Sequence, residues 1–163
     1  MIVVEERIYE ILNQLPAVDG DKPVYAWGDL KHLNKWIKLK REAEDPTYPL
    51  IYQTSKKETQ DIRKKLVTTP WEIVIATQNT NTSLTNDERW ALSFRNVLNP
   101  IAERIAEGFD KSGIINWEGV VDLERFGNFG EGNEHFTVDI WDAITFKATI
   151  TINNKCLNKI QWK

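Results

Sequence analysis

The sequence predicts one domain of mixed α and β structure, and two patterns support this prediction. Residues 136–153 read FTVDIWDAITFKATITIN, with apolar side chains at nearly every even position, as expected of strands with one buried face. Residues 3–15 and 90–109 instead repeat apolar side chains at intervals of three and four, as expected of amphipathic helices. A chain of 163 residues, 41% of them hydrophobic, is long enough for one core, so a single domain over residues 1–163 is expected.

The first third of the chain is expected to alternate between helix and strand. The helix over residues 3–15 ends at Pro16, because a proline does not continue a helix. Residues 23–28, PVYAWG, are typical of a short strand. A second helix over residues 29–44 follows, and Asp29 suits its N-cap because its carboxylate can accept a hydrogen bond from a free amide of the first turn.

A polar arm, residues 54–69, lies between two predicted strands at residues 50–53 and 71–78. Its composition predicts either a long hairpin or an exposed loop. Its cations either contact phosphates or form a solvated surface partly balanced by nearby acids. These cations are Lys56, Lys57, Arg63, Lys64 and Lys65.

A third helix, which carries the apolar series of residues 90–109, is expected to begin at a capping box formed by Thr85 and Glu88. Pro100 should kink or split this helix, because proline removes a helical hydrogen bond. A strand is predicted around residues 120–126, and the glycine-rich loop GNFGEGNEH follows at residues 127–135.

Asp142 interrupts the apolar series of residues 136–153. A single strand of this length would be far longer than the typical five or six residues. Either two strands or one strong bend is therefore expected, with the break near residues 141–143. Asp favours such turns, so a turn or a hydrogen-bonding role is expected for Asp142, and the residue is interpreted as a structural break. After residue 153 the sequence predicts a turn and a final short strand.

The composition argues against several classes of function. A net charge of −3 disfavours a general nucleic-acid-binding protein, and the single Cys156 allows no internal disulfide, as expected in a reducing compartment. No signal peptide or membrane span is predicted. Glu124, Asp139 and Asp142 are acids for an enzyme hypothesis, but residues three apart on a strand face opposite sides. No catalytic residue, cofactor or metal is expected.

The order of elements, with RFGNFG preceding DIWDAITFKATITI, resembles the tail terminator or tail-completion proteins of long-tailed bacteriophages and prophages. The resemblance implies an α+β fold with a mostly antiparallel β-sheet and two main helices packed on it. The segment at residues 29–44 is then a helical insertion. It also implies a structural protein without enzymatic activity, which forms a ring, usually a hexamer, that caps the tail tube.

The resemblance further implies three partners: other copies of the chain, the tail tube protein and a head–tail connector or neck protein. The protein would reside in the virion after assembly in the bacterial cytoplasm, and DNA would pass through the ring without sequence-specific binding. Two alternatives stay open, namely a connector or neck component of similar fold, and a nucleic-acid-binding module using residues 31–41 and 56–65. Candidate subunit contacts lie in the arm and in the glycine-rich loop: Lys56, Lys57, Arg63, Lys64, Lys65, Asn128 and Phe129.

Overall fold

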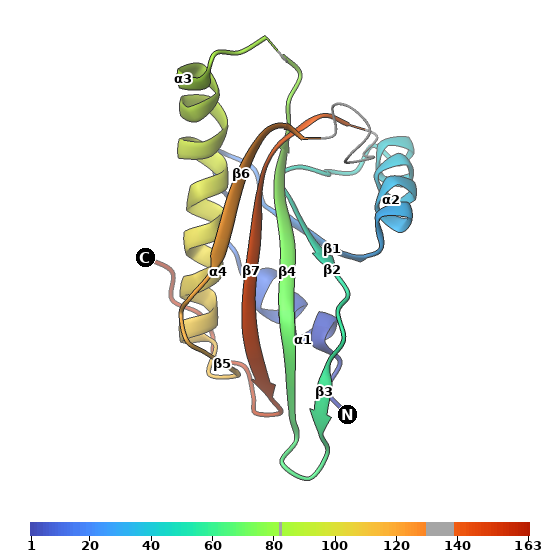
Figure 1. The fold of residues 1–163 in the computed structure, drawn as a ribbon, viewed down its shortest axis with the longest axis vertical. Coiled ribbons are helices and arrows are strands. Elements are labelled where there is room, and N and C mark those ends of the chain that lie inside the picture. The colour runs from blue at the N-terminus through green and yellow to red at the C-terminus, as the bar shows by residue number, and fades with distance from the viewer. Residues whose placement is uncertain (82, 130–138) are drawn as a thin grey trace.

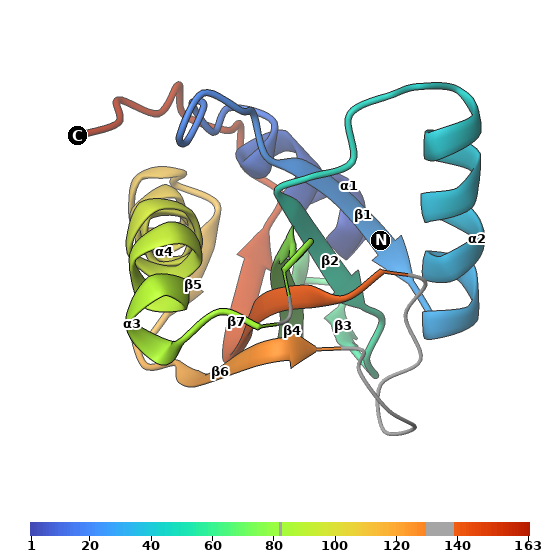
Figure 2. The ribbon, with the colours of Figure 1, turned by 90° about the horizontal axis from the view of Figure 1, so that it is seen from above.

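The computed structural model describes residues 1–81, 83–129 and 139–163, and it contains a twisted sheet with helices on both faces (Figure 1, Figure 2). Mixed α and β structure is therefore confirmed. The described strands are β1 (Val24–Gly28), β2 (Leu50–Thr54), β3 (Thr59–Asp61), β4 (Leu66–Gln78), β5 (Ile115–Trp117), β6 (Asp122–Phe129) and β7 (Trp141–Asn153). The described helical segments are α1 (Val4–Leu12), α2 (Leu30–Glu42), α3 (Asn86–Arg89), the π-helical η1 (Trp90–Leu98) and α4 (Asn99–Lys111).

β4 and β7 form the centre of the sheet. The strand order is β1-β2-β4-β7-β5, with β3 also beside β4 and β6 also beside β7. β4 and β7 are antiparallel over their whole lengths, from Leu66 opposite Asn153 to Gln78 opposite Trp141. β1 runs parallel to β2, and the other described pairings are antiparallel. The parallel pair results from α2, which provides the crossover connection that two parallel strands require.

One face of the sheet packs against α1 and against the long helix formed by α3, η1 and α4 (Figure 2). The ring of Trp71 is central to this core, with its centroid 4.9 Å from that of Phe109 and 5.6 Å from that of Phe146. None of these three residues is more than 1% exposed. Ile144 and Ile150 of β7 also face this core, so the predicted alternation identified the buried face of the last strand correctly.

α2 covers part of the opposite face and creates a second, smaller core. Leu33 and Ile37 of this helix are both buried. The second core contains Ala26, Leu33, Ile37, Leu50, Tyr52, Ala76, Trp141 and Ala143. The Asp29 carboxylate accepts a hydrogen bond from the His32 amide at 2.7 Å, which confirms the predicted N-cap.

The long helix begins with the predicted capping box. Thr85 Oγ1 accepts from the Glu88 amide at 3.3 Å, and Glu88 Oε2 accepts from the Thr85 amide at 2.8 Å. The long helix is split beside Pro100, as predicted, into the π-helical η1 and the α-helical α4, although the backbone of Leu98 and Asn99 stays helical. The Asn99 amide donates to the carbonyl of Phe94, five residues earlier, and α4 then begins with the proline in its first turn. Proline is tolerated there because its position needs no amide hydrogen.

The predicted break at residues 141–143 is wrong. β7 is continuous from Trp141, and Asp142 pairs in register with Thr77 of β4. A strand of this length persists because β4 is equally long and remains its partner throughout. The first part of the predicted strand region, residues 136–138, lies outside the described residues. The predicted final strand does not form either, and the irregular tail instead buries Ile160 against the core.

Candidate functional site

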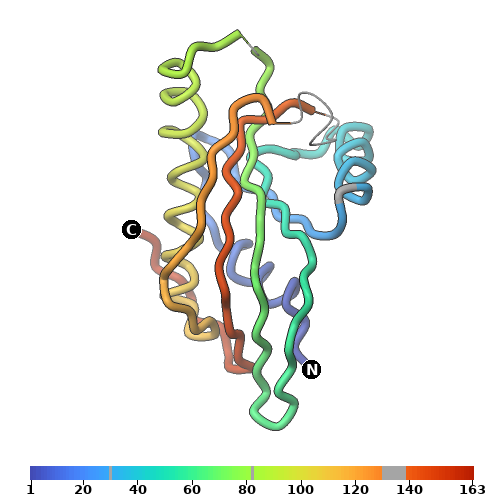
Figure 3. Tube along the Cα trace, in the orientation of Figure 1, coloured from blue at the N-terminus to red at the C-terminus, as the bar shows by residue number. Residues whose placement is uncertain are grey.

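The predicted polar arm is a hairpin made by β3 and the first residues of β4. Thr59 lies opposite Thr68, and Asp61 lies opposite Leu66. Figure 3 shows the hairpin turn projecting beyond the neighbouring strands at one end of the molecule. All five candidate cations of the arm are exposed: Lys56, Lys57, Arg63, Lys64 and Lys65.

The tip of the arm combines positive charge with an exposed apolar side chain. Ile62 is 70% exposed and lies in the turn. The Asp61 carboxylate accepts from the Lys64 amide at 3.0 Å, and Lys65 adopts a φ of 55°, so the turn has a defined shape. Sequence reasoning missed Ile62, because one apolar residue in a polar run produces no periodic signal.

The opposite edge of the sheet is formed by β5, β6 and the loop between them. β6 agrees approximately with the predicted strand at residues 120–126, whereas β5 was not predicted, because three residues are too few to show a period. Val120 is 67% exposed and Leu123 is 37% exposed. The exposed acids of this edge are Glu118, Asp122 and Glu124. Within the described residues, no strand pairs with the outer side of β6.

The other candidate subunit contacts, Asn128 and Phe129, lie at the end of β6 and contact their own chain. The Phe129 ring stacks on Trp141, with centroids 5.7 Å apart and an interplanar angle of 6°. The Asn128 side-chain oxygen accepts from Asn79 Nδ2 at 2.6 Å and from Arg89 Nη2 at 3.1 Å. The rest of the predicted loop, residues 130–135, lies outside the described residues. Contact between this region and a second subunit stays a prediction.

Asp142 connects β7 to the long helix and to the end of β4. Its Oδ2 accepts from Ser93 Oγ at 2.5 Å, and its Oδ1 accepts from Asn79 Nδ2 at 3.2 Å. Arg89 Nε lies 3.1 Å from Oδ1 but is not aligned for a hydrogen bond, so this contact is an ion pair. Asp142 is 0% exposed, and a buried carboxylate is tolerated only with such partners. Asp142 is therefore a structural anchor.

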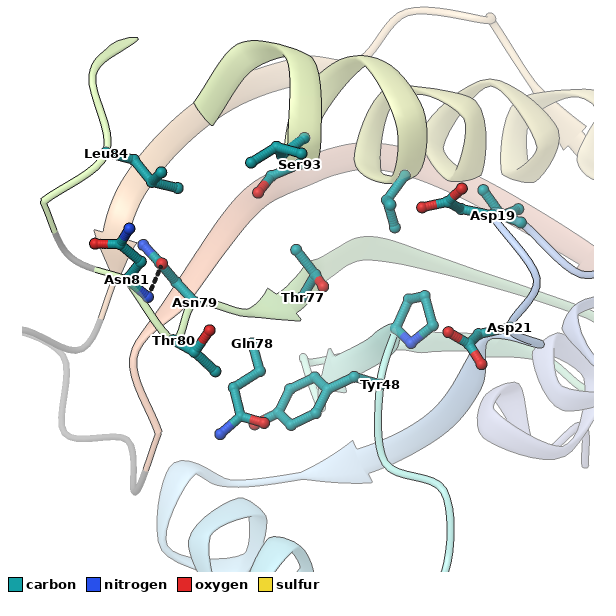
Figure 4. Close-up of a pocket in the computed structure, with 14 residues that line it drawn as sticks. Asp19, Asp21, Tyr48, Thr77, Gln78, Asn79, Thr80, Asn81, Leu84 and Ser93 are labelled. Carbon is teal, nitrogen blue, oxygen red and sulfur yellow. Dashed lines mark hydrogen bonds between the residues drawn. The ribbon is translucent and has the colours of Figure 1, made fainter. Parts of the chain in front are cut away.

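A pocket of about 360 Å³ opens beside this anchor, between η1, the end of β4 and the turn at residues 18–21 (Figure 4). Figure 4 shows Asp19 and Asp21 at one end, and Asn81 and Leu84 at the other. Ser93 lines the pocket, but its hydroxyl donates to Asp142. The described lining residues include hydroxyl, amide and carboxylate groups and no histidine, cysteine or lysine. The pocket can offer hydrogen bonds to a ligand, but no nucleophile with an adjacent histidine.

The acids considered for an enzyme lie in different environments. Asp139 accepts from the Tyr48 hydroxyl at 2.7 Å and forms an ion pair with Arg41 at 2.5 Å. Asp142 is buried in the cluster described above, whereas Glu124 is exposed on β6. The structure therefore does not bring these three carboxylates together in one site.

The second predicted basic segment, residues 31–41, lies on α2. Lys31, Lys35 and Lys38 are exposed, and they form the solvent side of the helix. Lys40 lies 5.5 Å from the ring centroid of Trp36, in a cation–π contact. The surface is compatible with solvation as well as with contact to a polyanion.

Neither a protein-family model nor a curated protein sequence matches this chain. Among the residues that the structure describes, no group of three or more His, Cys, Asp or Glu could hold a metal ion. No described helix is long and apolar enough to cross a membrane. The arm and the β5–β6 edge lie on opposite sides of the central strands β4 and β7, and they expose charges of opposite sign.

Proposed function

We propose that this protein is a tail terminator of a long-tailed bacteriophage or prophage, which assembles into a ring, usually a hexamer, at the end of the tail tube. Its partners are other copies of the chain, the tail tube protein and a head–tail connector or neck protein. It acts in the virion after assembly in the host cytoplasm. In this proposal the fold is tail-terminator-like, with α1 and the long helix as its two main helices and α2 as an insertion.

The observation that carries the proposal is the position of the arm relative to the opposite edge. Gln60 of β3 lies opposite Val67 of β4, Val67 lies opposite Ile152 of β7, and Ile152 lies opposite Ile115 of β5. One row of residues therefore crosses the sheet from the arm to β5. Two different edges at one level suit head-to-tail association, which generates a ring when the rotation between neighbours closes.

The proposed role depends on shape and needs no catalytic residue or cofactor. A ring on the end of a tube covers the surface to which the next tube subunit would bind. Its other face is then available to a connector. A connector or neck component with the same edges is the alternative, and the two roles differ in which partner binds first.

Native mass spectrometry and negative-stain electron microscopy test the proposal, first on the protein alone and then with tail tube protein. We expect a closed ring, formed either in solution or on the tube, and tubes of limited length with a cap at one end. A protein that stays monomeric at high concentration and leaves tubes uncapped contradicts the proposal. Rings that bind connector protein but never tubes indicate the connector role.

A further inference from the structure

We propose that the tip of the arm in one copy of the chain docks on the β5–β6 edge of the next copy. The arm tip consists of residues 62–65, and the receiving edge consists of residues 118–125. This inference rests on the proposed self-assembly and assigns the surfaces that perform it. The exposed apolar side chains and the charges of the two surfaces support it.

The two surfaces lie on opposite sides of the sheet and are offset along the strands. Asp122 of the receiving edge lies opposite Lys147, five residues along β7 from Ile152, which is roughly 17 Å. The row from Gln60 to Ile115 crosses β4 and β7, so three strand spacings, roughly 14 Å, separate β3 from β5. The hairpin turn also points away from the sheet (Figure 1). The arm therefore does not reach the β5–β6 edge of its own chain. A second copy placed alongside, and shifted along the strand direction by this offset, brings its arm tip to this edge.

The charges of the two surfaces are complementary. Residues 62–65 contain Arg63, Lys64 and Lys65 and no acid, for a net charge of +3. Residues 118–125 contain three acids and Arg125, for a net charge of −2. Opposite charges at exposed edges guide association and determine its register, and like charges disfavour arm-to-arm and edge-to-edge pairing. Charge therefore favours the head-to-tail arrangement.

Both surfaces also carry exposed apolar side chains. Ile62 is 70% exposed at the arm tip, and Val120 is 67% exposed on the receiving edge. Leu123 faces α4, and a groove of about 220 Å³ lies between this helix and β6. The groove is lined mainly by Ala102, Ala106, Val121, Leu123 and Phe146. Burial of these side chains between copies removes apolar surface from water, which stabilises the contact.

Directed disulfide formation tests the contact without loss of fold, because the changed residues are exposed. The exposed Cys156 is first replaced by serine in all variants. Ile62→Cys protein is then mixed with Val120→Cys protein under mild oxidation. We expect a disulfide-linked dimer in the mixture at several times the yield obtained with Leu39→Cys, a control at an exposed apolar residue of α2 (54% exposed). If Ile62→Cys protein forms the linked dimer equally well with Val120→Cys and with Leu39→Cys protein, the inference is overturned.

Charge reversal provides the second test. We expect Arg63→Glu with Lys64→Glu, and separately Asp122→Lys with Glu124→Lys, to weaken self-association at least tenfold at low salt. Mixing these two variants places opposite charges at every contact again, so assembly should be restored. The control, Lys35→Glu with Lys38→Glu, changes the charge of α2 by the same amount as the arm variant and should assemble like the unaltered protein.

These outcomes separate the inference from the proposed function. If the unaltered protein forms rings and both reversed variants form them equally well, the docking contact is wrong and the ring proposal stands. If the cross-link and the charge rescue are seen in open chains that neither close nor cap tubes, the contact stands and the terminator function is wrong. If the unaltered protein does not assemble, alone or with tail tube protein, and the cysteine variants do not cross-link, both are wrong.

Discussion

Asp142 of β7 and Arg89 at the end of α3 form a buried ion pair, in which Arg89 Nε lies 3.1 Å from Asp142 Oδ1. The side chains are 1% and 14% exposed, respectively. Asn79 and Ser93 donate hydrogen bonds to the same carboxylate, so one side chain connects the central strand to the helix and to the end of β4. The pair joins elements that are far apart in sequence, and its removal should affect the whole domain.

We expect Asp142→Ala to lower the free energy of unfolding by about 3 kcal/mol, because it leaves the largely buried Arg89 cation without a charged partner and removes the acceptor of Ser93 and Asn79. Urea denaturation followed by circular dichroism measures the change. Thr149→Ala, on the exposed face of the same strand, is the control and should change stability by less than about 0.5 kcal/mol. Equal stabilities of the two variants would contradict the anchoring role.

The capping box provides a second stability prediction. Thr85→Ala removes the acceptor for the Glu88 amide at the start of the long helix, and it should cost about 1 kcal/mol. Ser83→Ala, two residues earlier, serves as the control for loss of a hydroxyl in the same loop. Thermal denaturation distinguishes the variants, and a Thr85 variant as stable as the Ser83 variant would show that the cap is not important.

A pH prediction follows from three tyrosines. Burial, with the Asp29 carboxylate as a smaller cause, raises the pKa of Tyr52 to about 12. Burial also raises the pKa of Tyr25, with a smaller effect of Glu5, and it raises the pKa of Tyr48, helped by the hydrogen bond to Asp139. Above pH ~10 the unfolded chain loses these protons while the folded chain keeps them. Stability should therefore be complete below pH ~10 and fall as the pH rises further.

Ultraviolet absorbance of tyrosinate tests this prediction directly. The folded protein should ionise part of its tyrosine only at a pH well above that of the urea-denatured protein, which titrates near pH ~10. Denaturation midpoints measured at increasing pH should decline over the same interval. Coinciding titration curves of the folded and denatured protein would show that the tyrosines are not protected.

The basic side of α2 tests the nucleic-acid alternative. Under the ring proposal we expect no tight binding of duplex DNA, and Lys35→Glu with Lys38→Glu should leave any weak binding nearly unchanged. Fluorescence anisotropy of labelled DNA at several salt concentrations measures both quantities. Strong salt-dependent binding that this double variant abolishes would instead favour a nucleic-acid-binding module.

Local patterns in the sequence were sufficient for most elements of the fold. The caps at Asp29 and Thr85 were predictable because each depends on one short-range hydrogen bond within three residues. The buried face of β7 was predictable because strand side chains alternate between the two faces. These features depend on neighbours in the chain and not on tertiary pairing.

The break predicted at Asp142 was wrong, whereas its hydrogen-bonding role is confirmed, and the environment that explains both is made by distant residues. Its partners Asn79, Arg89 and Ser93 lie 49 or more residues away in sequence, and no local pattern indicates them. The position of the acidic β5–β6 edge could not be predicted either, because it depends on which strands β5 and β6 pair with. The alternation of apolar residues predicts which face of a strand is buried. It does not predict which strands pair with it, because pairing depends on residues far away in the sequence.

The central position of β7 has a consequence for biosynthesis. β7 follows the other described strands in the sequence, so the ribosome makes it after the strands at both edges of the sheet. Until β7 is made, β4 lacks its partner on one side, and no strand connects β4 to β5. Domains fold as units, so a truncated chain presents neither edge in its final position. Under the proposed docking contact, a chain could therefore present the arm and the receiving edge together only after β7 has been made.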